Sequence, residues 1–211
     1  MSREPRPLMV VIAGHNGAGK STCYRSFLAA TLGQHLDEHI DPDAVEREIR
    51  AEMTEAGIVM PKVWFSAQAQ KESNKLREQY FASRTPFSFE TVLSDPVGDK
   101  VEFMRRAVEG GYLVVLMAVG LDSPEKSLQR VSLRVQHGGH DVPVDRVYSR
   151  YPRVIENLRK ASLVATLAIL IDNSDDNTDY NAGAYRPFAL FAGGALLKSD
   201  GATPEWWGSL H

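Results

Sequence analysis

The sequence predicts an α/β fold in which a mostly parallel sheet carries helices on both faces. Apolar, β-branched runs at Leu8–Ala13, Tyr112–Val119 and Leu167–Ile171 alternate with longer stretches of helical periodicity. These runs lack an apolar/polar alternation, as expected for strands that are buried on both sides in a parallel sheet. The first run leads directly into a glycine-rich turn and a helix. Strands that alternate with helices imply right-handed crossovers and two outer helical layers.

The first half of the chain contains three predicted helices. Apolar side chains recur at helical spacing over Ser21–Leu32, and Gly33 is predicted to end that helix. A short extended piece at His39–Ile40 precedes a helix at Ala44–Glu55. The segment Lys62–Ser83 has no interior proline or glycine and therefore predicts one long helix.

The second half is divided by helix caps and glycines. We expect a strand at Phe87–Val92, helices at Gly98–Val108, Ser123–Gln136 and Val144–Ala161, and a hairpin at Arg186–Lys198. Ser123 is a typical N-cap, and a first-turn proline and an acid follow it. The Gly193-Gly194 pair between short apolar runs predicts the turn of the hairpin.

The length of 211 residues suits one domain and is too short for two ordinary domains with a linker. We therefore expect a single domain over 1–211, with its core at about 8–174 and a lid at about 126–153. The C-terminal hairpin would be a small appendage at about 185–198.

Composition excludes several classes of partner and site. The 24 basic and 27 acidic residues nearly cancel, so there is no electrostatic case for nucleic acid or an anionic membrane as partner. The only cysteine, Cys23, excludes an internal disulfide and a multi-cysteine metal site. The N-terminus lacks a signal-peptide pattern, and no run has the roughly 18 apolar residues of a membrane span. We expect a soluble protein of the reducing cytoplasm.

The glycine-rich turn matches the phosphate-binding pattern G-x-x-x-x-G-K-[ST] at every fixed position. Its glycines let consecutive backbone N–H groups turn toward phosphate oxygens, and the following helix directs its positive end at them. Lys20 would bridge the β- and γ-phosphates of ATP, and Ser21 would hold Mg²⁺. The residues expected to bind the nucleotide are Gly14, His15, Asn16, Gly17, Ala18, Gly19, Lys20, Ser21 and Thr22.

Several classes of protein contain such a loop. ABC-type transport ATPases also carry Leu-Ser-Gly-Gly-Gln and a strand that ends in Asp-Glu, and neither occurs in this sequence. A GTPase needs Asn-Lys-x-Asp, and Asn74–Arg77 lacks the aspartate, although Asp95–Gly98 fits the short Asp-x-x-Gly pattern. A tight turn with a surface lysine is the purely structural alternative. Small-molecule kinases need neither signature, so we favour a kinase with a three-layer, P-loop kinase-like fold.

A kinase must hold a hydroxyl in line with the γ-phosphate and accept its proton. Asp43 follows the second extended segment, at the sheet edge where strand ends point at the nucleotide, and is the candidate catalytic base and substrate ligand. The alternative is that Asp41 and Asp43 only cap the next helix. Glu90 and Thr91 lie at the end of a predicted strand, where we expect substrate binding rather than a structural ion pair.

Arginines that neutralise the transferred phosphate are expected in the lid. Arg130, Arg134 and Arg150 flank the glycine-rich break at 137–141, between two helices that suit a closing lid. The alternative for each arginine is a solvated helix surface. His137 and His140 alone cannot fill a zinc shell, so we expect a turn there.

Together these residues resemble the zeta-toxin family of P-loop kinases, in particular its short bacterial branch. The resemblance rests on five stretches that occur in the same order, namely Ala13–Thr22, Ile40–Val45, Phe87–Thr91, Arg130–Pro143 and Arg150–Leu158. They lie within 8–174, which is most of the chain, and the terminal hairpin adds little to the match.

The resemblance implies an ATP- and magnesium-dependent kinase with Asp43 as its catalytic base. It implies that Glu90 and Thr91 bind the substrate and that Arg130 stabilises the transferred phosphate. It further implies UDP-N-acetylglucosamine, phosphorylated on a sugar hydroxyl, as the substrate, and a small helical antitoxin as a partner. The alternatives are an ATP-binding or ATP-hydrolysing regulatory protein without a small-molecule acceptor, and a kinase of another small metabolite.

Two positions depart from the family pattern. His140 stands where the family has a second lid arginine, so Arg134 or Arg150 would have to replace it. The long helix lacks a clear second substrate-binding acid, and Asn74 is nearest to that position. These departures affect the identity of the substrate more than the type of reaction.

Overall fold

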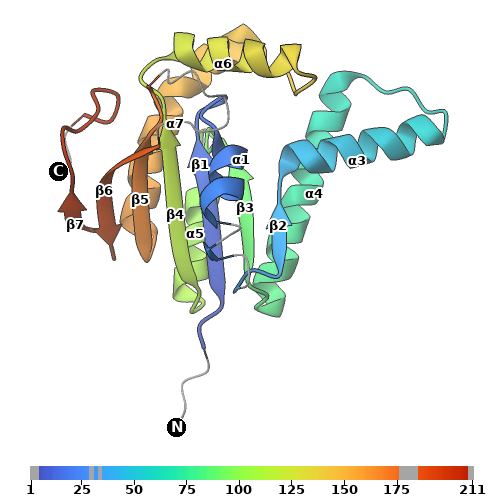
Figure 1. Cartoon of the computed structure of the whole chain (residues 1–211). Helices are drawn as coiled ribbons and strands as arrows, with labels where there is room; N and C mark the ends of the chain where they lie inside the picture. The colour runs from blue at the N-terminus through green and yellow to red at the C-terminus, as the bar shows by residue number, and fades with distance from the viewer. Residues whose placement is uncertain (1–4, 29–30, 33–34, 176–184, 209–211) are drawn as a thin grey trace.

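The computed structural model describes residues 5–28, 31–32, 35–175 and 185–208. Within these residues, seven strands form one mixed sheet in the order β2-β3-β1-β4-β5-β6-β7 (Figure 1). The strands are β1 (Leu8–Gly14), β2 (Glu38–Ile40), β3 (Phe87–Thr91), β4 (Leu113–Gly120), β5 (Leu167–Asp172), β6 (Arg186–Ala192) and β7 (Ala195–Ser199). Strands β1 to β5 pair in parallel, whereas β6 and β7 run antiparallel. The predicted fold class and the C-terminal hairpin are therefore confirmed.

Strand β1 lies in the centre of the sheet and is buried on both faces. Met9 and Val11 join one hydrophobic cluster, whereas Val10 and Ile12 join a second cluster on the opposite face. All four side chains are fully buried. This two-sided burial explains why the sequence of β1 is continuously apolar.

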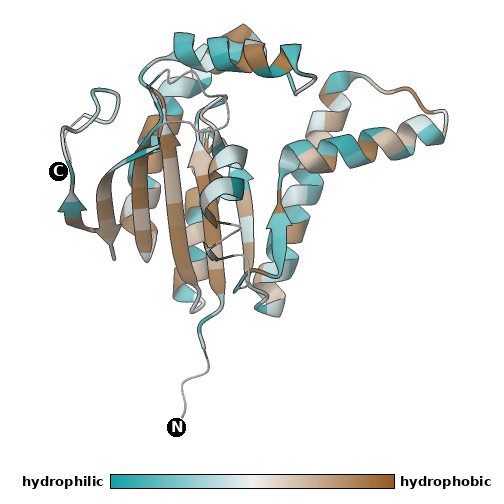
Figure 2. Ribbon diagram, viewed as in Figure 1, coloured by the Kyte–Doolittle hydropathy of each residue, from teal (hydrophilic) through white to brown (hydrophobic). Residues whose placement is uncertain are grey.

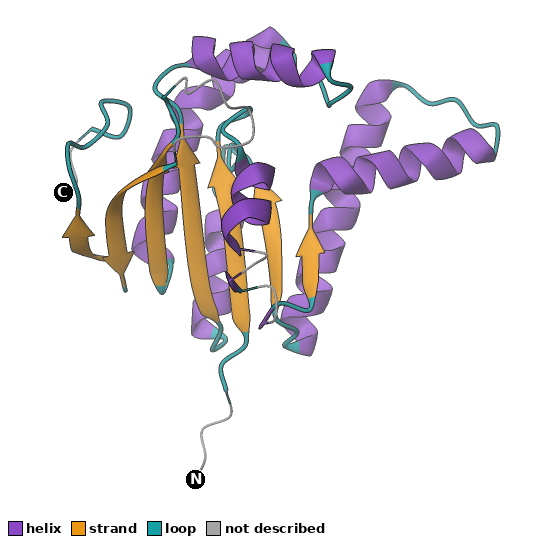
Figure 3. Ribbon diagram, in the orientation of Figure 1, coloured by secondary structure: helices purple, strands orange, loops and turns teal. Residues whose placement is uncertain are grey.

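Helices cover both faces of the sheet and form its two outer layers (Figures 1 and 3). One face carries α1 (Lys20–Cys23) and the π-helical turn η1 (Tyr24–Leu28), and the other carries α5 (Asp99–Glu109) and α7 (Val144–Val164). The pair α3 (Pro42–Glu55) and α4 (Lys62–Ser83) projects beyond the edge strand β2, and α6 (Pro124–Gln136) lies across the upper edge of the sheet. Five strands end at that upper edge, which positions the site.

Local chemistry sets where the helices beside the site begin. Asp41 caps α3 by accepting a hydrogen bond from the Asp43 amide at 2.9 Å, with Pro42 in the first turn. Ser123 caps α6 in the same way, accepting from the Lys126 amide at 3.2 Å. Both beginnings follow from sequence signals for helix starts.

The helix after the glycine-rich turn differs from its prediction. It begins at Lys20, and its second half is a π-helix over Tyr24–Leu28 rather than an α-helix. The Tyr24 ring stacks on His39 with centroids 3.7 Å apart, a contact to the edge strand that helical periodicity does not encode. The predicted end of this helix at Gly33 lies outside the described residues.

Hydropathy follows the layers of the fold. In Figure 2 the central strands β1, β4 and β5 are mainly brown, the edge strand β2 is mainly teal, and the helices mix both colours. Among the described residues, no helix combines the length and the apolar character that crossing a membrane requires.

Candidate active site

The glycine-rich turn between β1 and α1 holds its lysine inside a cavity at the edge of the sheet. Lys20 Nζ donates hydrogen bonds to the backbone carbonyls of Gly14 (3.2 Å) and His15 (3.0 Å). Burial lowers the pKa of Lys20, and the nearby carboxylates of Glu90 and Asp43 oppose that shift. The ammonium group therefore faces the carboxylates across a site where a phosphate can bind.

Side chains from distant strands fix the shape of the loop. Asn173, just after β5, donates to the Ala18 carbonyl at 2.9 Å, and Ser127 of α6 donates to the Asn16 carbonyl. Tyr185 donates to the Gly19 carbonyl at 2.7 Å, and burial raises the pKa of Tyr185 to about 12, which keeps this donor protonated. Gly19 has φ +85°, and a Cβ there would lie 2.6 Å from the Tyr185 hydroxyl. Only glycine fits both constraints.

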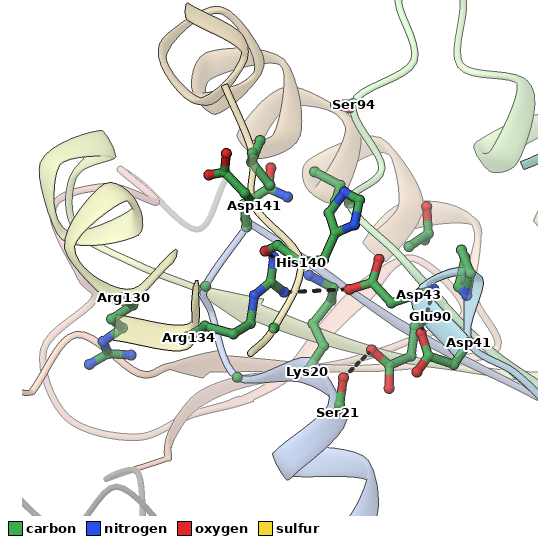
Figure 4. A pocket seen from close by; sticks show the side chains of 18 of the residues that line it. Lys20, Ser21, Asp41, Asp43, Glu90, Ser94, Arg130, Arg134, His140 and Asp141 are labelled. Atoms are coloured by element: carbon green, nitrogen blue, oxygen red, sulfur yellow. Dashed lines mark hydrogen bonds and ion pairs between the residues drawn. The ribbon is translucent and has the colours of Figure 1, made fainter. Parts of the chain in front are cut away.

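Ser21 and Glu90 connect the loop to the end of β3. Ser21 Oγ donates to Glu90 Oε2 at 2.8 Å (Figure 4). His39 Nε2 lies 3.7 Å from Glu90 Oε1. Glu90 is buried with only 6% of its surface exposed, and Thr91 beside it also lines the cavity. The predicted magnesium ligand and the predicted substrate-binding acid are thus direct neighbours.

Asp41 and Asp43 enter the cavity from the start of α3. Asp41 is the helix cap, and burial followed by the charges of Glu90 and Asp43 raises its pKa. Asp43 is more open, with 44% of its side chain exposed. The capping alternative therefore applies to Asp41, while the Asp43 carboxylate points toward Lys20 and Arg134 (Figure 4).

The oxygen donors of this region suit a hard cation. Ser21, Asp41 and Glu90 offer hydroxyl and carboxylate oxygens, the ligands that Mg²⁺ prefers. In the described part of the chain, no group of three or more histidine, cysteine, aspartate or glutamate side chains is arranged to hold a metal ion by itself. This donor set fits an ion that takes much of its coordination from nucleotide phosphates and water.

The three predicted arginines line the same cavity but do not meet at one point. Arg134 NH1 lies 3.5 Å from Asp43 Oδ2, and its NH2 group donates to the His140 carbonyl. Arg130 points away from Asp43 (Figure 4), and its NH2 group donates to the Asp175 carbonyl at 3.1 Å. Arg150 of α7 also lines the cavity. In this conformation, Arg134 is the lid arginine beside the candidate base.

The loop at 137–143 between α6 and α7, the tip of the predicted lid, contacts the projecting helices. His140 Nδ1 lies 3.4 Å from Glu46 Oε1 of α3, and Lys62 of α4 lies 3.9 Å from Asp141. Burial disfavours the charged form of Glu46, but hydrogen bonds from Ser66 and Arg50 lower its pKa overall. The lid tip therefore rests on a buried, ionised acid that the sequence analysis did not single out.

Positive side chains gather at one end of the cavity, around Lys100 and the first turns of α7. Lys100, at the start of α5, lies 3.9 Å from Asp95, and burial lowers its pKa. Burial, and then the charges of Arg146 and Arg153, also lower the pKa of Arg150. Mutual repulsion between these cations favours an anionic ligand at this end of the cavity.

These parts form one continuous cavity of about 970 Å³, which is large enough for a nucleotide and a second ligand. The predicted residues that line it are Asn16, Gly17, Gly19, Lys20, Ser21, Thr22, Asp43, Glu90, Thr91, Arg130, Arg134 and Arg150. The loop residues Gly14, His15 and Ala18 are buried and do not line the cavity.

Several lining residues were missed by the sequence analysis. Asn173 directly follows a predicted buried strand, so the rule that ligands bind at strand ends could have found it. Glu46 and Lys100 are charged positions on helices and carry no comparable signal. Asn74, proposed as nearest to a second substrate-binding acid, is exposed and does not line the cavity, whereas Gln70 one turn earlier does.

Comparisons with known proteins agree with this fold. The zeta toxin family model matches residues 1–184. No curated protein matches the sequence. A crystal structure of AvrRxo1-ORF1:-ORF2 with ATP superposes with a TM-score of 0.69 at 18% identity, covering 92% of this chain and 61% of that chain. A structure from the PezAT chromosomal toxin-antitoxin system of Streptococcus pneumoniae gives 0.59 at 16% identity, covering 81% of this chain and 69% of that chain. The chain thus spans about three fifths of the AvrRxo1 protein, and these likenesses show the fold.

Proposed function

The chain belongs to the zeta toxin family, whose model covers residues 1–184, and on this premise we propose that it transfers the γ-phosphate of ATP to a hydroxyl of a small molecule. The observation that carries the proposal is the meeting of Lys20, Asp43 and Glu90 in one cavity, with Arg134 beside Asp43. A phosphate-binding loop alone does not name a reaction, but these side chains supply the functions that a kinase requires.

The roles proposed for the side chains follow from their positions. Lys20 would bind the phosphates of ATP once they replace its carbonyl contacts, and Asp43 would accept the proton of the acceptor hydroxyl. The acceptor oxygen bonds to the γ-phosphorus while the bond to the β–γ bridging oxygen breaks and ADP leaves. Arg134 would move from Asp43 to the transferring phosphate. Mg²⁺, held by the Ser21 hydroxyl and through water by Asp41 or Glu90, would neutralise phosphate charge.

The cations of the cavity support an acceptor that itself carries phosphate. Lys100, Arg146 and Arg150 line the cavity together, and Ser66 and Gln70 on α4 offer hydrogen bonds suited to sugar hydroxyls. A nucleoside diphosphate sugar has both features. We therefore propose a UDP-N-acetyl sugar as the acceptor, as the family resemblance implies.

The proposal includes a single kinase domain whose segment 126–153 acts as a lid over the bound nucleotide.

We also propose a small helical antitoxin as the partner of this protein. The solved relatives support this partner, since PezAT is described as a toxin-antitoxin system and AvrRxo1-ORF1 was crystallised with ORF2. Induced expression in a bacterium should slow growth, and Lys20→Met should remove the effect. Unimpaired growth at high expression of wild-type protein would argue against a toxin.

An acceptor screen tests the reaction. The protein is incubated with Mg-ATP and one candidate acceptor at a time, namely UDP-N-acetylglucosamine, UDP-N-acetylgalactosamine, UDP-glucose or free N-acetylglucosamine. The mass of each acceptor is then measured by mass spectrometry. We expect one added phosphate on a UDP-N-acetyl sugar and none with Lys20→Met. Release of inorganic phosphate without modification of any acceptor would instead favour an ATPase. Transfer to a different hydroxyl compound would contradict the proposed substrate but not the proposed kinase reaction.

A further inference from the structure

The C-terminal segment contributes two buried tryptophans to the molecule. Residues 185–208 lie beyond the end of the family match at 184. Trp206 and Trp207 follow the hairpin and are 7% and 2% exposed. Their rings pack with Phe188 of β6, at centroid distances of 5.8 and 6.0 Å.

Trp206 reaches the edge of the sheet where the phosphate-binding loop lies. Its Nε1 donates to Asp172 Oδ1 at the end of β5, at 3.0 Å. Its six-membered ring covers Gly120 at the end of β4 so closely that a Cβ there would lie 2.1 Å from it. Any larger residue at 120 would displace the tryptophan. The side chain is thus fixed between the ends of two central strands.

From this position Trp206 contacts a residue of the loop itself. Its ring meets the His15 ring edge to face, with centroids 6.0 Å apart and an interplanar angle of 86°. Tyr151 stacks on the same histidine at 4.4 Å, and the Leu121 amide donates to His15 Nδ1 at 3.3 Å. His15 is therefore enclosed by aromatic rings and held at one nitrogen.

The backbone of the same histidine holds the phosphate-binding lysine. The His15 carbonyl accepts hydrogen bonds from Lys20 Nζ at 3.0 Å and from the Ala18 amide at 3.2 Å. Because Tyr151, Trp206 and the Leu121 amide all hold the His15 ring, they limit its rotation, and the short link through Cβ and Cα lets these contacts restrain the carbonyl as well. The contact from Trp206 therefore reaches Lys20 through a single residue.

We propose that Trp206 is a positioning residue of the nucleotide site, which holds His15 and thereby the turn that places Lys20. The proposal rests on the proposed binding of ATP at this loop. Trp206 does not line the cavity, so it acts through His15 and not by touching the nucleotide. Loss of its ring should weaken the binding of Mg-ATP.

Trp207 offers a matched control for a merely structural role. It lies in the same segment and is at least as buried, and its carbonyl accepts a hydrogen bond from Arg159, whose guanidinium lies over the indole at 5.6 Å. Its ring contacts Phe188 and Trp206, and the structure gives it no ring contact with the described part of the loop. Trp206→Phe and Trp207→Phe should therefore lose similar amounts of buried contact, but only Trp206→Phe should change the contact with His15 of the loop.

The first test compares the dissociation constants of Trp206→Phe and Trp207→Phe for Mg-ATP, by calorimetric titration, together with their melting temperatures. We expect Trp206→Phe to weaken binding by roughly three- to tenfold, and Trp207→Phe to leave it within about twofold at a comparable loss of melting temperature. Equal effects of the two variants on binding, or no effect of either, would overturn the proposal.

A second test follows Trp206 directly by fluorescence. The protein with Trp64→Phe and Trp207→Phe retains only Trp206, and its emission should change as Mg-ATP binds. The protein with Trp64→Phe and Trp206→Phe retains only Trp207 and should respond much less. A silent Trp206 in a protein that calorimetry shows to bind Mg-ATP would contradict the proposal. If wild-type protein does not bind Mg-ATP at all, the proposed function fails first, so the two failures are distinguishable.

Discussion

His15 makes stability depend on pH through a single buried ring. Burial, and then the positive charge of Lys20, lowers the pKa of His15 from 6.5 to about 3. The histidine is neutral in the folded protein at pH 7 and takes up a proton on unfolding once the pH falls below about 6.5. Its contribution to stability is therefore present at neutral pH and is lost progressively as the pH falls from 6.5 toward 3.

This dependence can be measured by urea unfolding of wild-type protein and His15→Gln at pH 7 and pH 5. We expect the free energy of unfolding of the wild type to fall by about 2 kcal/mol more than that of the variant over this interval. The pKa values of Asp172 and Glu46 are lowered in the folded protein, so these two acids lose their contribution to stability only at a pH below this interval. Parallel pH dependences in the two proteins would mean that His15 is protonated in the folded state.

At the scale of residues, the sequence predicts the residues of the motifs, but it does not predict the residues that pack against the loop and hold it in place. Lys20, Ser21, Asp43 and Glu90 could be placed from the sequence, because a spacing rule and the ends of predicted strands locate them. Trp206 contacts the loop only because the sheet brings positions far apart in sequence together, and no local pattern encodes that.

At the scale of elements, the predicted lid, formed by α6, α7 and the loop between them, and the projecting helix pair line the same cavity. The lid tip between α6 and α7 meets α3 through His140 and Glu46, and Arg134 ties the same tip to Asp43. Glu46 is only 6% exposed, so its charge is weakly screened and its contacts are worth more than a surface pair. These contacts hold the lid against the helix that carries the candidate base.

The variant Glu46→Gln should loosen the lid, because it removes the charge that attracts His140 and Arg50. Amide hydrogen exchange over 137–143 is expected to become several-fold faster, and Mg-ATP should slow it again if the lid closes on the nucleotide. Glu48→Gln, an exposed change on the same helix, serves as the control. Exchange that is equally fast in wild-type protein and Glu46→Gln would show that the contact does not hold the lid.

Most elements followed from sequence patterns, and the exceptions have local causes. Long helices such as Lys62–Ser83 and the capped helix at Pro124–Gln136 appear where periodicity and caps place them. The turn at Tyr24–Leu28 became π-helical, where the Tyr24 ring stacks on His39 of a neighbouring strand. Arg130 and Arg134 share a helix face as expected, yet their different side-chain directions separate their heads.

At the scale of the whole molecule, the parallel sheet gathers the site from distant parts of the chain. The carboxyl ends of β1, β2 and β3 supply the loop, the start of α3 and Glu90, while α6 and α7 close the cavity from above (Figure 1). The glycine-rich loop with Lys20, the candidate acids Asp43 and Glu90, and the cations Lys100 and Arg150 all line this single cavity. This combination is the basis for proposing that a donor nucleotide and an anionic acceptor bind together.

The central claim is that this cavity transfers phosphate to a hydroxyl, with Asp43 as the base. The most direct measurement is the rate of phosphate incorporation into a UDP-N-acetyl sugar by wild-type protein, Asp43→Asn and Glu48→Gln, beside calorimetric binding of Mg-ATP. Glu48 is an exposed acid on the same helix and does not line the cavity, so Glu48→Gln removes a nearby charge without changing the site and serves as the control.

We expect Asp43→Asn to lose roughly 10²- to 10⁴-fold in rate while it still binds Mg-ATP, because the phosphate loop is unchanged. Glu48→Gln should keep close to the wild-type rate. Wild-type turnover by Asp43→Asn, or an equal loss of activity in Glu48→Gln, would contradict the account.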